Sequence, residues 1–273
     1  MKSPETKKKA KTDMRKRRNP VAVFDSGVGG LSVLPELIGR MPREDFVFFG
    51  DAANAPYGER SAEEVRRLTD DAVSRLIANG AKAVVIACNT ATSAAAGYLR
   101  EKFPAVPIIG MEPALKPAAE AGDHPRVVVM ATPLTIREEK LRALSDKLRD
   151  KADFVFVPCH GLVEAVERGE VEGDGTLSLV REILVPRLEG ADSIVLGCTH
   201  YAHVRRVIAE VAGPGIMIFD GAGGTARETE RRLSEADLLT DSEEKGGITL
   251  LSSSRDPDYS RIMEKLLARQ VEK

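Results

Sequence analysis

The stretch IVLGCTHYAHV, residues 194–204, decides the fold. Three apolar residues run into Gly197 and Cys198, and helix-compatible sequence follows. A buried parallel strand of an α/β sheet delivers its last side chains to the carboxyl edge of the sheet in this way. The stretch VVIACNTAT, residues 84–92, repeats the arrangement and places Cys88 110 residues before Cys198. We therefore predict a fold that brings Cys88 and Cys198 face to face.

Four apolar strands in the first part of the chain have counterparts in the second. They begin near residues 21, 46, 84 and 108 and again near 127, 154, 194 and 216, with offsets between 106 and 110. A repeated βα unit of about 107 residues is longer than solenoid repeats, so we expect two related domains. The predicted fold class is α/β, with two pseudo-symmetric doubly wound parallel-sheet domains and the site in the cleft between them.

The duplication sets the expected domain boundaries. We place the first α/β domain at residues 21–112 and 214–273 and the second at 113–213. A strand near residues 248–251 and the helix that follows have no counterpart, so they are expected to complete the first domain.

Residues 1–20 differ from the rest of the chain. They carry nine Lys or Arg and almost nothing apolar, which predicts a disordered basic tail. A basic arm can bind nucleic acid, but this one has no interleaved aromatic residue for base stacking. We therefore expect weak, salt-sensitive binding by the tail at best, and no nucleic acid as the main partner.

The composition is that of an ordinary globular chain, with 273 residues of which 42% are hydrophobic. Aromatic residues make up 4% and Trp is absent, so the core is aliphatic, which suits buried parallel strands. No apolar run approaches the roughly 18 residues of a membrane span, and the basic N-terminus lacks the apolar segment of a signal peptide. We expect a cytoplasmic protein without a membrane partner, whose three cysteines are free thiols.

Residues 21–30 join a short strand to a glycine-rich turn that begins with Asp25 and Ser26. The glycine spacing differs from the dinucleotide fingerprint, and Asp25 would repel a pyrophosphate. Glycines let the backbone approach a bound anion, and a helix start offers unpaired N–H groups. We predict that Ser26 and these N–H groups hold a small carboxylate.

Each of the two motif cysteines is expected at a helix start, where the helix dipole favours the thiolate and lowers the pKa of the thiol. The carboxylate of Asp25 can reach the Cys88 side, and His200 lies two residues after Cys198. A hydrolase needs only one such nucleophile. Two thiols on opposite walls of a cleft suit racemisation, because one removes a proton from a carbon and the other returns one to the opposite face. Such a reaction needs no metal or organic cofactor if the site stabilises the carbanion.

Other interpretations of the cysteines remain open at this point. A buried cysteine after a strand is often a small apolar residue, and we interpret Cys159, which has no duplicate, in that way. Zinc binding by Cys198, His200 and His203 is conceivable, but the spacing matches neither a CxxC nor an HExxH motif. We expect no metal, and we expect His203 to pack or to be solvated.

The motifs DSGVGGLS at 25–32, GDAANAPYG at 50–58, ACNTAT at 87–92 and GCTHY at 197–201 resemble, together and in this order, the glutamate racemases of the aspartate/glutamate racemase family. The resemblance implies cofactor-independent interconversion of L- and D-glutamate, which supplies D-glutamate for peptidoglycan, and thus for the cell wall and cell shape. It also implies two α/β domains with the site between them, and a homodimer.

The resemblance also implies roles for individual residues. Cys88 and Cys198 become the acid/base thiols, with Asp25 assisting Cys88 and with His200 and Glu167 assisting Cys198. The implied substrate contacts come in pairs along the chain: Asp25 and Ser26, Tyr57 and Gly58, Asn89 and Thr90, Thr199 and His200. The sequence departs from the family after GCTHY, where Ala202 and His203 replace Pro and Leu. It also has Arg-Glu-Glu-Lys at 137–140, where many members have a Ser and a Tyr that contact the substrate.

Three competing functions remain. An aspartate or hydantoin racemase would share the fold, but aspartate-type relatives usually have Glu in place of the histidine of GCTHY. A cysteine amidohydrolase would release ammonia and depend on Cys88 alone. A nucleic-acid-binding protein would act through residues 7–18.

Overall fold

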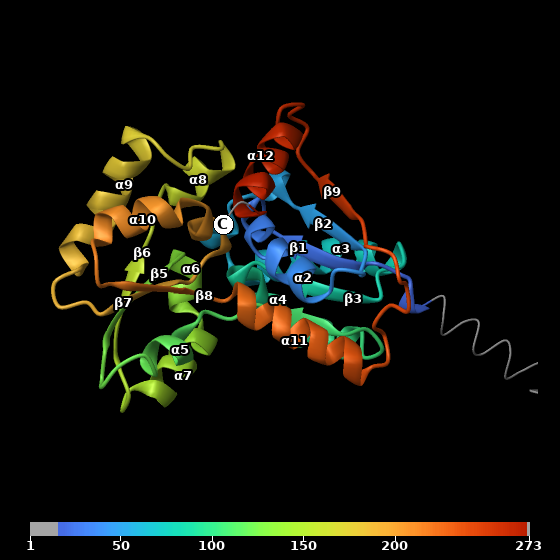
Figure 1. Cartoon of the computed structure of the whole chain (residues 1–273), viewed down its shortest axis with the longest axis horizontal. Coiled ribbons are helices and arrows are strands. Elements are labelled where there is room, and N and C mark those ends of the chain that lie inside the picture. Colours follow the sequence, from blue (N-terminus) through green and yellow to red (C-terminus); the bar gives the residue numbers. More distant parts are fainter. Residues whose placement is uncertain (1–15, 272–273) are drawn as a thin grey trace, which may run out of the picture.

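The protein, seen here as a computed structural model, is described for residues 16–271. The described chain forms two parallel β-sheets, each in its own α/β domain, which lie side by side (Figure 1). The first domain is built on the sheet of β1–β4 and β9, and the second on the sheet of β5–β8. The predicted fold class of two parallel-sheet α/β domains is confirmed.

The sheet of the first domain has the strand order β4-β3-β1-β2-β9. Its strands are β1 (Val21–Asp25), β2 (Phe46–Gly50), β3 (Ala83–Ile86), β4 (Ile108–Gly110) and β9 (Ile248–Ser252). All neighbouring strands are parallel, so Asp25 and Gly50 are paired at the same carboxyl edge. This edge faces the second domain.

The sheet of the second domain has the order β6-β5-β7-β8, from β5 (Arg126–Ala131), β6 (Asp153–Pro158), β7 (Ser193–Leu196) and β8 (Met217–Asp220). When β5, β6, β7 and β8 are matched to β1, β2, β3 and β4, the two strand orders are identical. The repeated strand spacing in the sequence therefore corresponds to a repeated topology.

Helices cover both faces of each sheet. They are α2 (Leu34–Arg40), α3 (Ala62–Ala78), α4 (Asn89–Lys102), α5 (Leu115–Ala119), α6 (Pro133–Arg137), α7 (Glu139–Leu148), α8 (Leu162–Glu167), α9 (Asp174–Leu184), α10 (Arg205–Ala212), α11 (Ala222–Glu235) and α12 (Tyr259–Val271). Short 3-10 helices are η1 (Gly29–Ser32), η2 (Ala52–Asn54), η3 (Tyr57–Glu59), η4 (Val185–Arg187) and η5 (Thr199–Val204). Successive strand residues point to opposite faces of the sheet, so helices on both faces bury side chains from every position of the strand.

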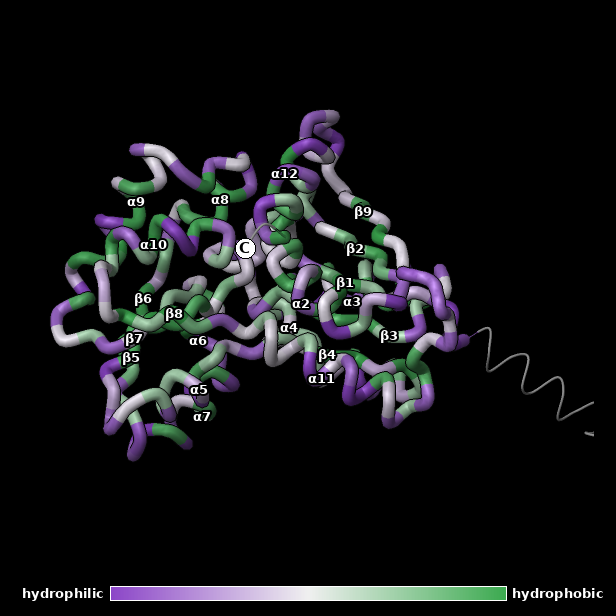
Figure 2. The backbone as a smooth tube through the Cα atoms, in the orientation of Figure 1, coloured by the Kyte–Doolittle hydropathy of each residue, from purple (hydrophilic) through white to green (hydrophobic). Residues whose placement is uncertain are grey.

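The alternation is visible in the packing of β1. Ala22 and Phe24 lie in the cluster formed with α3 and α4, whereas Val21 and Val23 lie in the cluster formed with α2 and α11. In the second domain, α5 and α7 cover one face, and α8, α9 and α10 cover the other. Figure 2 shows the strands as largely hydrophobic and the outer helices as mixed.

Two expected boundaries need correction. The strand β8 was expected in the first domain, beyond residue 214, but it pairs with β7 in the second, because the fourth strand of each unit closes its own sheet. The expected tail of residues 1–20 is too long. Arg17 forms an ion pair with Asp237, and Lys82 Nζ donates to the carbonyl of Arg17, so the chain is held from residue 17. The remainder of the predicted tail lies outside the described residues. The strand β9 completes the first domain as predicted.

The chain passes between the domains twice, after β4 and after β8. These two passages touch, because a Cβ added at Gly221 would lie 2.4 Å from the carbonyl oxygen of Glu112. Within residues 16–271, no helix has the length and apolar character needed to cross a lipid bilayer.

Candidate active site

The two motif cysteines stand at equivalent places in the two domains. Cys88 follows β3 and caps α4, and Cys198 follows β7 and precedes η5. Both are buried, at 5% and 8% exposure. Ser26 lies 3.4 Å from the Cys88 sulfur, and its neighbour Asp25 accepts the hydroxyl of Thr199, the residue after Cys198, so both thiols stand at the same junction of the two domains.

The sulfur of Cys88 has two polar neighbours. Its Sγ accepts a hydrogen bond from the backbone N–H of Ala91 at 3.4 Å and lies 3.4 Å from Ser26 Oγ. Burial raises the pKa of the Cys88 thiol to about 12, and the charge of Asp25 adds to this, while the bonds from Ser26 and Ala91 oppose it. The expectation that the helix start lowers this pKa is therefore wrong for Cys88, because the cost of desolvating a thiolate exceeds the gain from the helix N-terminus.

Cys198 has a different set of neighbours. Its Sγ lies 3.7 Å from Nδ1 of His200, and Nε2 of the same imidazole lies 2.6 Å from Oε1 of Glu167. Sulfur, imidazole and carboxylate thus form a line that starts at β7 and ends at the C-terminal end of α8. A carboxylate that holds one imidazole nitrogen fixes the ring and determines which nitrogen faces the sulfur.

The charges along this line support each other. Burial alone would lower the pKa of His200, but the hydrogen bonds to Cys198 and Glu167 hold it well above its usual value. Burial alone would raise the pKa of Glu167, but the bond to His200 leaves it below its usual value. The pair is therefore an imidazolium and a carboxylate, and the cation lies next to the Cys198 sulfur.

Asp25 joins the two domains at the end of β1. Its Oδ1 accepts the backbone N–H of Gly27 at 2.9 Å, and its Oδ2 accepts the hydroxyl of Thr199 at 3.0 Å. Burial raises the pKa of the Asp25 carboxyl despite the charge of His200 and these two donors. The direct hydrogen-bond partner of Cys88 from this loop is Ser26, while Asp25 acts on Cys88 through its charge.

The glycines of the same loop allow a close approach between the domains that the sequence did not predict. A Cβ at Gly27 would lie 1.8 Å from Oε1 of Glu167, and a Cβ at Gly29 would lie 2.3 Å from Nδ1 of His200. The backbone N–H of Val28 donates to Glu167 at 2.9 Å. The loop was expected to approach a carboxylate ligand, and here it approaches the carboxylate of Glu167 in the other domain.

The predicted contacts Tyr57 and Gly58 lie in η3, which packs against α4 and α6. The buried hydroxyl of Tyr57 donates to Oδ2 of Asp51 at 2.6 Å, and burial raises the pKa of Tyr57. Gly58 packs closely against Thr132 of the second domain, since a Cβ there would lie 2.6 Å from the Cβ of that residue. Tyr57 is therefore held by its own domain, and Gly58 lies at the junction of the two.

Asn89 and Thr90 begin α4 and face the second domain. Asn89 is 4% exposed, yet neither its amide nitrogen nor its amide oxygen has a hydrogen-bond partner. Thr90 Oγ1 lies 3.1 Å from the hydroxyls of Thr132 and Thr135, which are themselves 2.9 Å apart. A buried amide without a partner is costly unless a ligand satisfies it.

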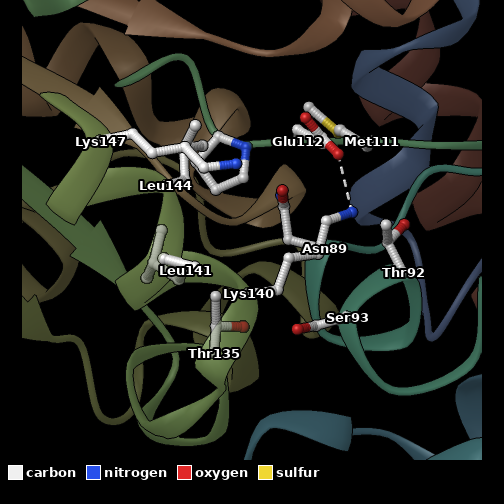
Figure 3. Close-up of a pocket in the computed structure, with 12 residues that line it drawn as sticks. Asn89, Thr92, Ser93, Met111, Glu112, Thr135, Lys140, Leu141, Leu144 and Lys147 are labelled. Atoms are coloured by element: carbon white, nitrogen blue, oxygen red, sulfur yellow. Dashed lines mark ion pairs between the residues drawn. The ribbon is translucent and has the colours of Figure 1, made fainter. Parts of the chain in front are cut away.

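Asn89 also lines a cavity of about 240 Å³ between α4 and α7. Figure 3 shows Asn89, Thr135 and Leu144 around it, and the ion pair of Lys140 with Glu112, at 2.7 Å, beside it. Lys140 belongs to the segment 137–140 in which the sequence departs from the resembled family. Here this segment contributes a charged group to the rim of the cavity.

Two residues near the site were not predicted. Tyr259, at the start of α12, donates its hydroxyl to Oε2 of Glu167. Asp51 accepts hydrogen bonds from Tyr57 and, at 2.8 Å, from Ser253. Asp51 lies within the GDAANAPYG motif, which was the one available signal. Tyr259 is 92 residues from its partner and belongs to no motif.

Cys159 and His203 are the remaining candidates, and both have hydrogen-bond partners on the backbone. Cys159 is buried and donates to the carbonyl of Val157 at 3.4 Å. His203 Nε2 lies 3.2 Å from the carbonyl oxygen of Gly29, and its Nδ1 lies 3.0 Å from the amide of Gln270, so it packs between domains as expected. Among residues 16–271, no three His, Cys, Asp or Glu side chains are grouped as metal ligands would be.

Comparisons with known proteins agree with this geometry. Residues 36–229 match the model of the family described as Asp/Glu/Hydantoin racemase. A glutamate racemase from Clostridium perfringens is 45% identical over 249 residues, which cover 91% of this chain and 96% of that protein.

Solved structures give the same result. The crystal structure of glutamate racemase from Francisella tularensis in complex with D-glutamate has a TM-score of 0.80 at 27% identity, covering 92% of this chain and 94% of that one. The structure of the Escherichia coli enzyme, in complex with L-glutamate and an activator, also has a TM-score of 0.80, at 28% identity, with 92% and 95% covered.

Proposed function

The chain belongs to the Asp/Glu/Hydantoin racemase family and is an amino-acid racemase, and we propose that Cys88 and Cys198 carry out the interconversion of L- and D-glutamate. The observation that supports this most is the pair of buried thiols at equivalent strand ends of two duplicated domains. Each thiol would handle the α-proton on one face of the substrate. One thiolate takes the proton, the α-carbon becomes planar, and the other thiol returns a proton from the opposite side.

The two half-sites differ in ways that suit opposite starting states. Cys88 has a raised pKa of about 12 beside Ser26 and Asp25, so it rests as a thiol that can donate. Cys198 has an acid/base group beside it, because its Sγ lies 3.7 Å from Nδ1 of His200, and in our proposal it is the thiol that accepts the first proton. One turnover exchanges these roles, and the reverse reaction restores them.

The substrate contacts we propose surround the thiols. Asn89 has an amide without a partner, and it would bind a substrate carboxylate. Ser26, Thr90, Thr199 and the backbone of η3 at Tyr57 and Gly58 supply further donors, and Asp25 would bind the ammonium group. Fixed donors around a developing negative charge stabilise it without a metal or organic cofactor.

The proposal extends to the setting of the enzyme. D-glutamate would serve peptidoglycan biosynthesis, and we propose that the enzyme works in the cytoplasm as a homodimer. Sedimentation velocity at micromolar concentration tests the dimer, because a single species with the mass of one chain would refute it.

We also propose the division of the chain that this mechanism uses. Sheet membership supports a second domain of residues 113–220, with residues 16–112 and 221–271 in the first. The site then lies between one continuous and one discontinuous domain.

The test of substrate is direct. L-glutamate incubated with enzyme and no added cofactor should lose its circular dichroism signal, and D-glutamate should lose it at a comparable rate. Run in parallel, L-aspartate should turn over at least about 100-fold more slowly, because its shorter side chain would leave a buried polar group of the site, such as the Asn89 amide, without its partner. A faster rate with aspartate, or ammonia release from glutamine without racemisation, would refute the glutamate assignment.

The thiol roles are tested by replacing each sulfur with oxygen. Cys88→Ser and Cys198→Ser should each lower kcat by at least about 10³-fold, since a serine hydroxyl is a far weaker base than a thiolate. Cys159→Ser provides the matched control, because that thiol is bonded to a strand carbonyl and should leave kcat within about twofold. Near-normal kcat in either Cys88→Ser or Cys198→Ser would contradict the two-thiol mechanism.

A further inference from the structure

The last helix reaches from the first domain to the second. β9 adds to the first sheet, and α12 follows it, beginning at Tyr259. The Tyr259 side chain is 7% exposed, and its hydroxyl donates to Oε2 of Glu167 in α8. The end of the chain thus contacts the carboxylate that holds His200.

This contact completes the hydrogen bonding of Glu167. Oε1 accepts the backbone N–H of Val28 at 2.9 Å and lies 2.6 Å from Nε2 of His200. Oε2 accepts the hydroxyl of Tyr259. With donors on both oxygens, the carboxylate is held in one orientation. Its bond to His200 then fixes the orientation of the imidazole between Glu167 and Cys198.

We propose that Tyr259 is a positioning residue for the racemase reaction, which orients Glu167 and His200 and thereby the proton transfer at Cys198. The inference rests on the proposed function. The hydroxyl of Tyr259 bonds to Glu167, which holds the His200 beside Cys198, so we expect it to act on the Cys198 half-site. The terminal helix is in this way part of the catalytic apparatus of the second domain.

The substitution that isolates the hydroxyl is Tyr259→Phe. The ring packs in the main hydrophobic cluster, and phenylalanine preserves that packing. Tyr98→Phe is the matched control, because it removes a hydroxyl bonded to Asp70 at 3.3 Å on the surface of α4. Thermal unfolding of both variants checks that the fold is intact.

The readout follows from a property of enantiomers. Their free energies in water are equal, so kcat/KM must fall by the same factor in both directions whichever half-site is damaged. The isotope effect of an α-deuterium does not have this constraint. If only the step at Cys198 is slowed, the isotope effect on kcat/KM rises in the direction in which Cys198 removes the proton. In the other direction, in which Cys88 removes it, the effect falls.

We expect Tyr259→Phe to lower kcat/KM about tenfold in both directions, with the isotope effect rising for one enantiomer and falling for the other. The acidic limb of the pH profile should move to higher pH, because removing this donor raises the pKa of Glu167. The Tyr98→Phe control should keep all these values.

Two results would overturn the inference. One is a change in kcat/KM of less than about twofold, and the other is a loss without opposite changes in the two isotope effects, which would indicate general loosening. Neither result affects the proposed function as long as the unaltered enzyme racemises glutamate. Failure of the unaltered enzyme to racemise would remove the proposed function and this inference together.

Discussion

At the scale of single residues, the two thiols are chemically unequal. Cys88 is buried next to a carboxylate, and Cys198 is next to an imidazolium. The sequence predicted that both stand at strand ends near helix starts. It could not predict the inequality, because the pKa of a thiol depends on burial and on residues from distant segments. It also could not predict Tyr259, whose partner Glu167 lies in another domain.

The raised pKa of Cys88 makes stability depend on pH. The folded thiol holds its proton up to about pH 12, whereas the unfolded thiol loses it near 8.5. The folded state therefore binds more protons between these values, so this contribution is complete below about pH 8.5 and is lost as pH rises. Between pH 7.5 and pH 10, the free energy of unfolding of Cys88→Ser, measured in urea, should rise by about 1–2 kcal/mol relative to that of the unaltered protein. If the variant and the unaltered protein differ in free energy of unfolding by the same amount at both pH values, the raised pKa of Cys88 is contradicted.

The pair of Glu167 and His200 should contribute most in weakly acidic solution. The raised pKa of His200 gives stability that is complete below about 6.5 and is lost at higher pH, and the lowered pKa of Glu167 gives stability present above about 4.5. Glu167→Gln should therefore cost about 2–3 kcal/mol near pH 5.5 and less at pH 9. Denaturant titrations at these two pH values measure it, and an equal cost at both would show that the pair is not charged as described.

At the scale of elements, the loop between β1 and η1 is built for close approach. Sequence reasoning identified its glycines but could not show that they also face Glu167 and His200, because those residues lie about 140 to 170 residues away, as the Val28 to Glu167 separation of 139 illustrates. Contacts across a cleft are not encoded in the local pattern of either side.

Substitution of these glycines tests the interpretation. Gly29→Ala should reduce kcat at least about 100-fold, because the new Cβ would lie 2.3 Å from His200 Nδ1 and displace the imidazole. Gly39→Ala in α2 is the control. Its Cβ meets nothing within 4 Å, so activity should be retained and stability should rise by up to about 1 kcal/mol. Equal activity in the two variants would show that the loop does not set the position of His200.

The amino ends of the first sheet are held by a buried ion pair. Lys82 and Glu44 have side chains that are 1% and 2% exposed, and Glu44 also accepts the N–H of Thr240 at 2.7 Å. Lys82→Ala should cost about 3–5 kcal/mol, because Glu44 would remain buried without its cation. Arg67→Ala breaks an exposed ion pair with Asp71 and should cost less than about 1 kcal/mol. Chemical denaturation at pH 7 compares the two, and similar costs would contradict the described burial.

At the scale of the whole molecule, the duplication was the most predictable feature. Apolar strands at repeated offsets require a sheet in each half, and the carboxyl ends of parallel strands must share an edge. The placement of β8 was less predictable, since an edge strand of four residues has the same pattern whichever sheet it joins. The helix α12 shows the limit of sequence-based prediction most clearly, because it follows a strand of one domain and hydrogen-bonds to Glu167 of the other.

The central claim is that two thiols on opposite sides of one carbon share the reaction. The most direct measurement is the position of deuterium after brief incubation in deuterium oxide, starting from each enantiomer in turn. The claim predicts that newly formed product carries solvent deuterium at its α-carbon, while the unreacted enantiomer still carries protium. Product that keeps the original protium, or deuterium that appears equally in both enantiomers from the start, would show that a single base serves both faces and would contradict the claim.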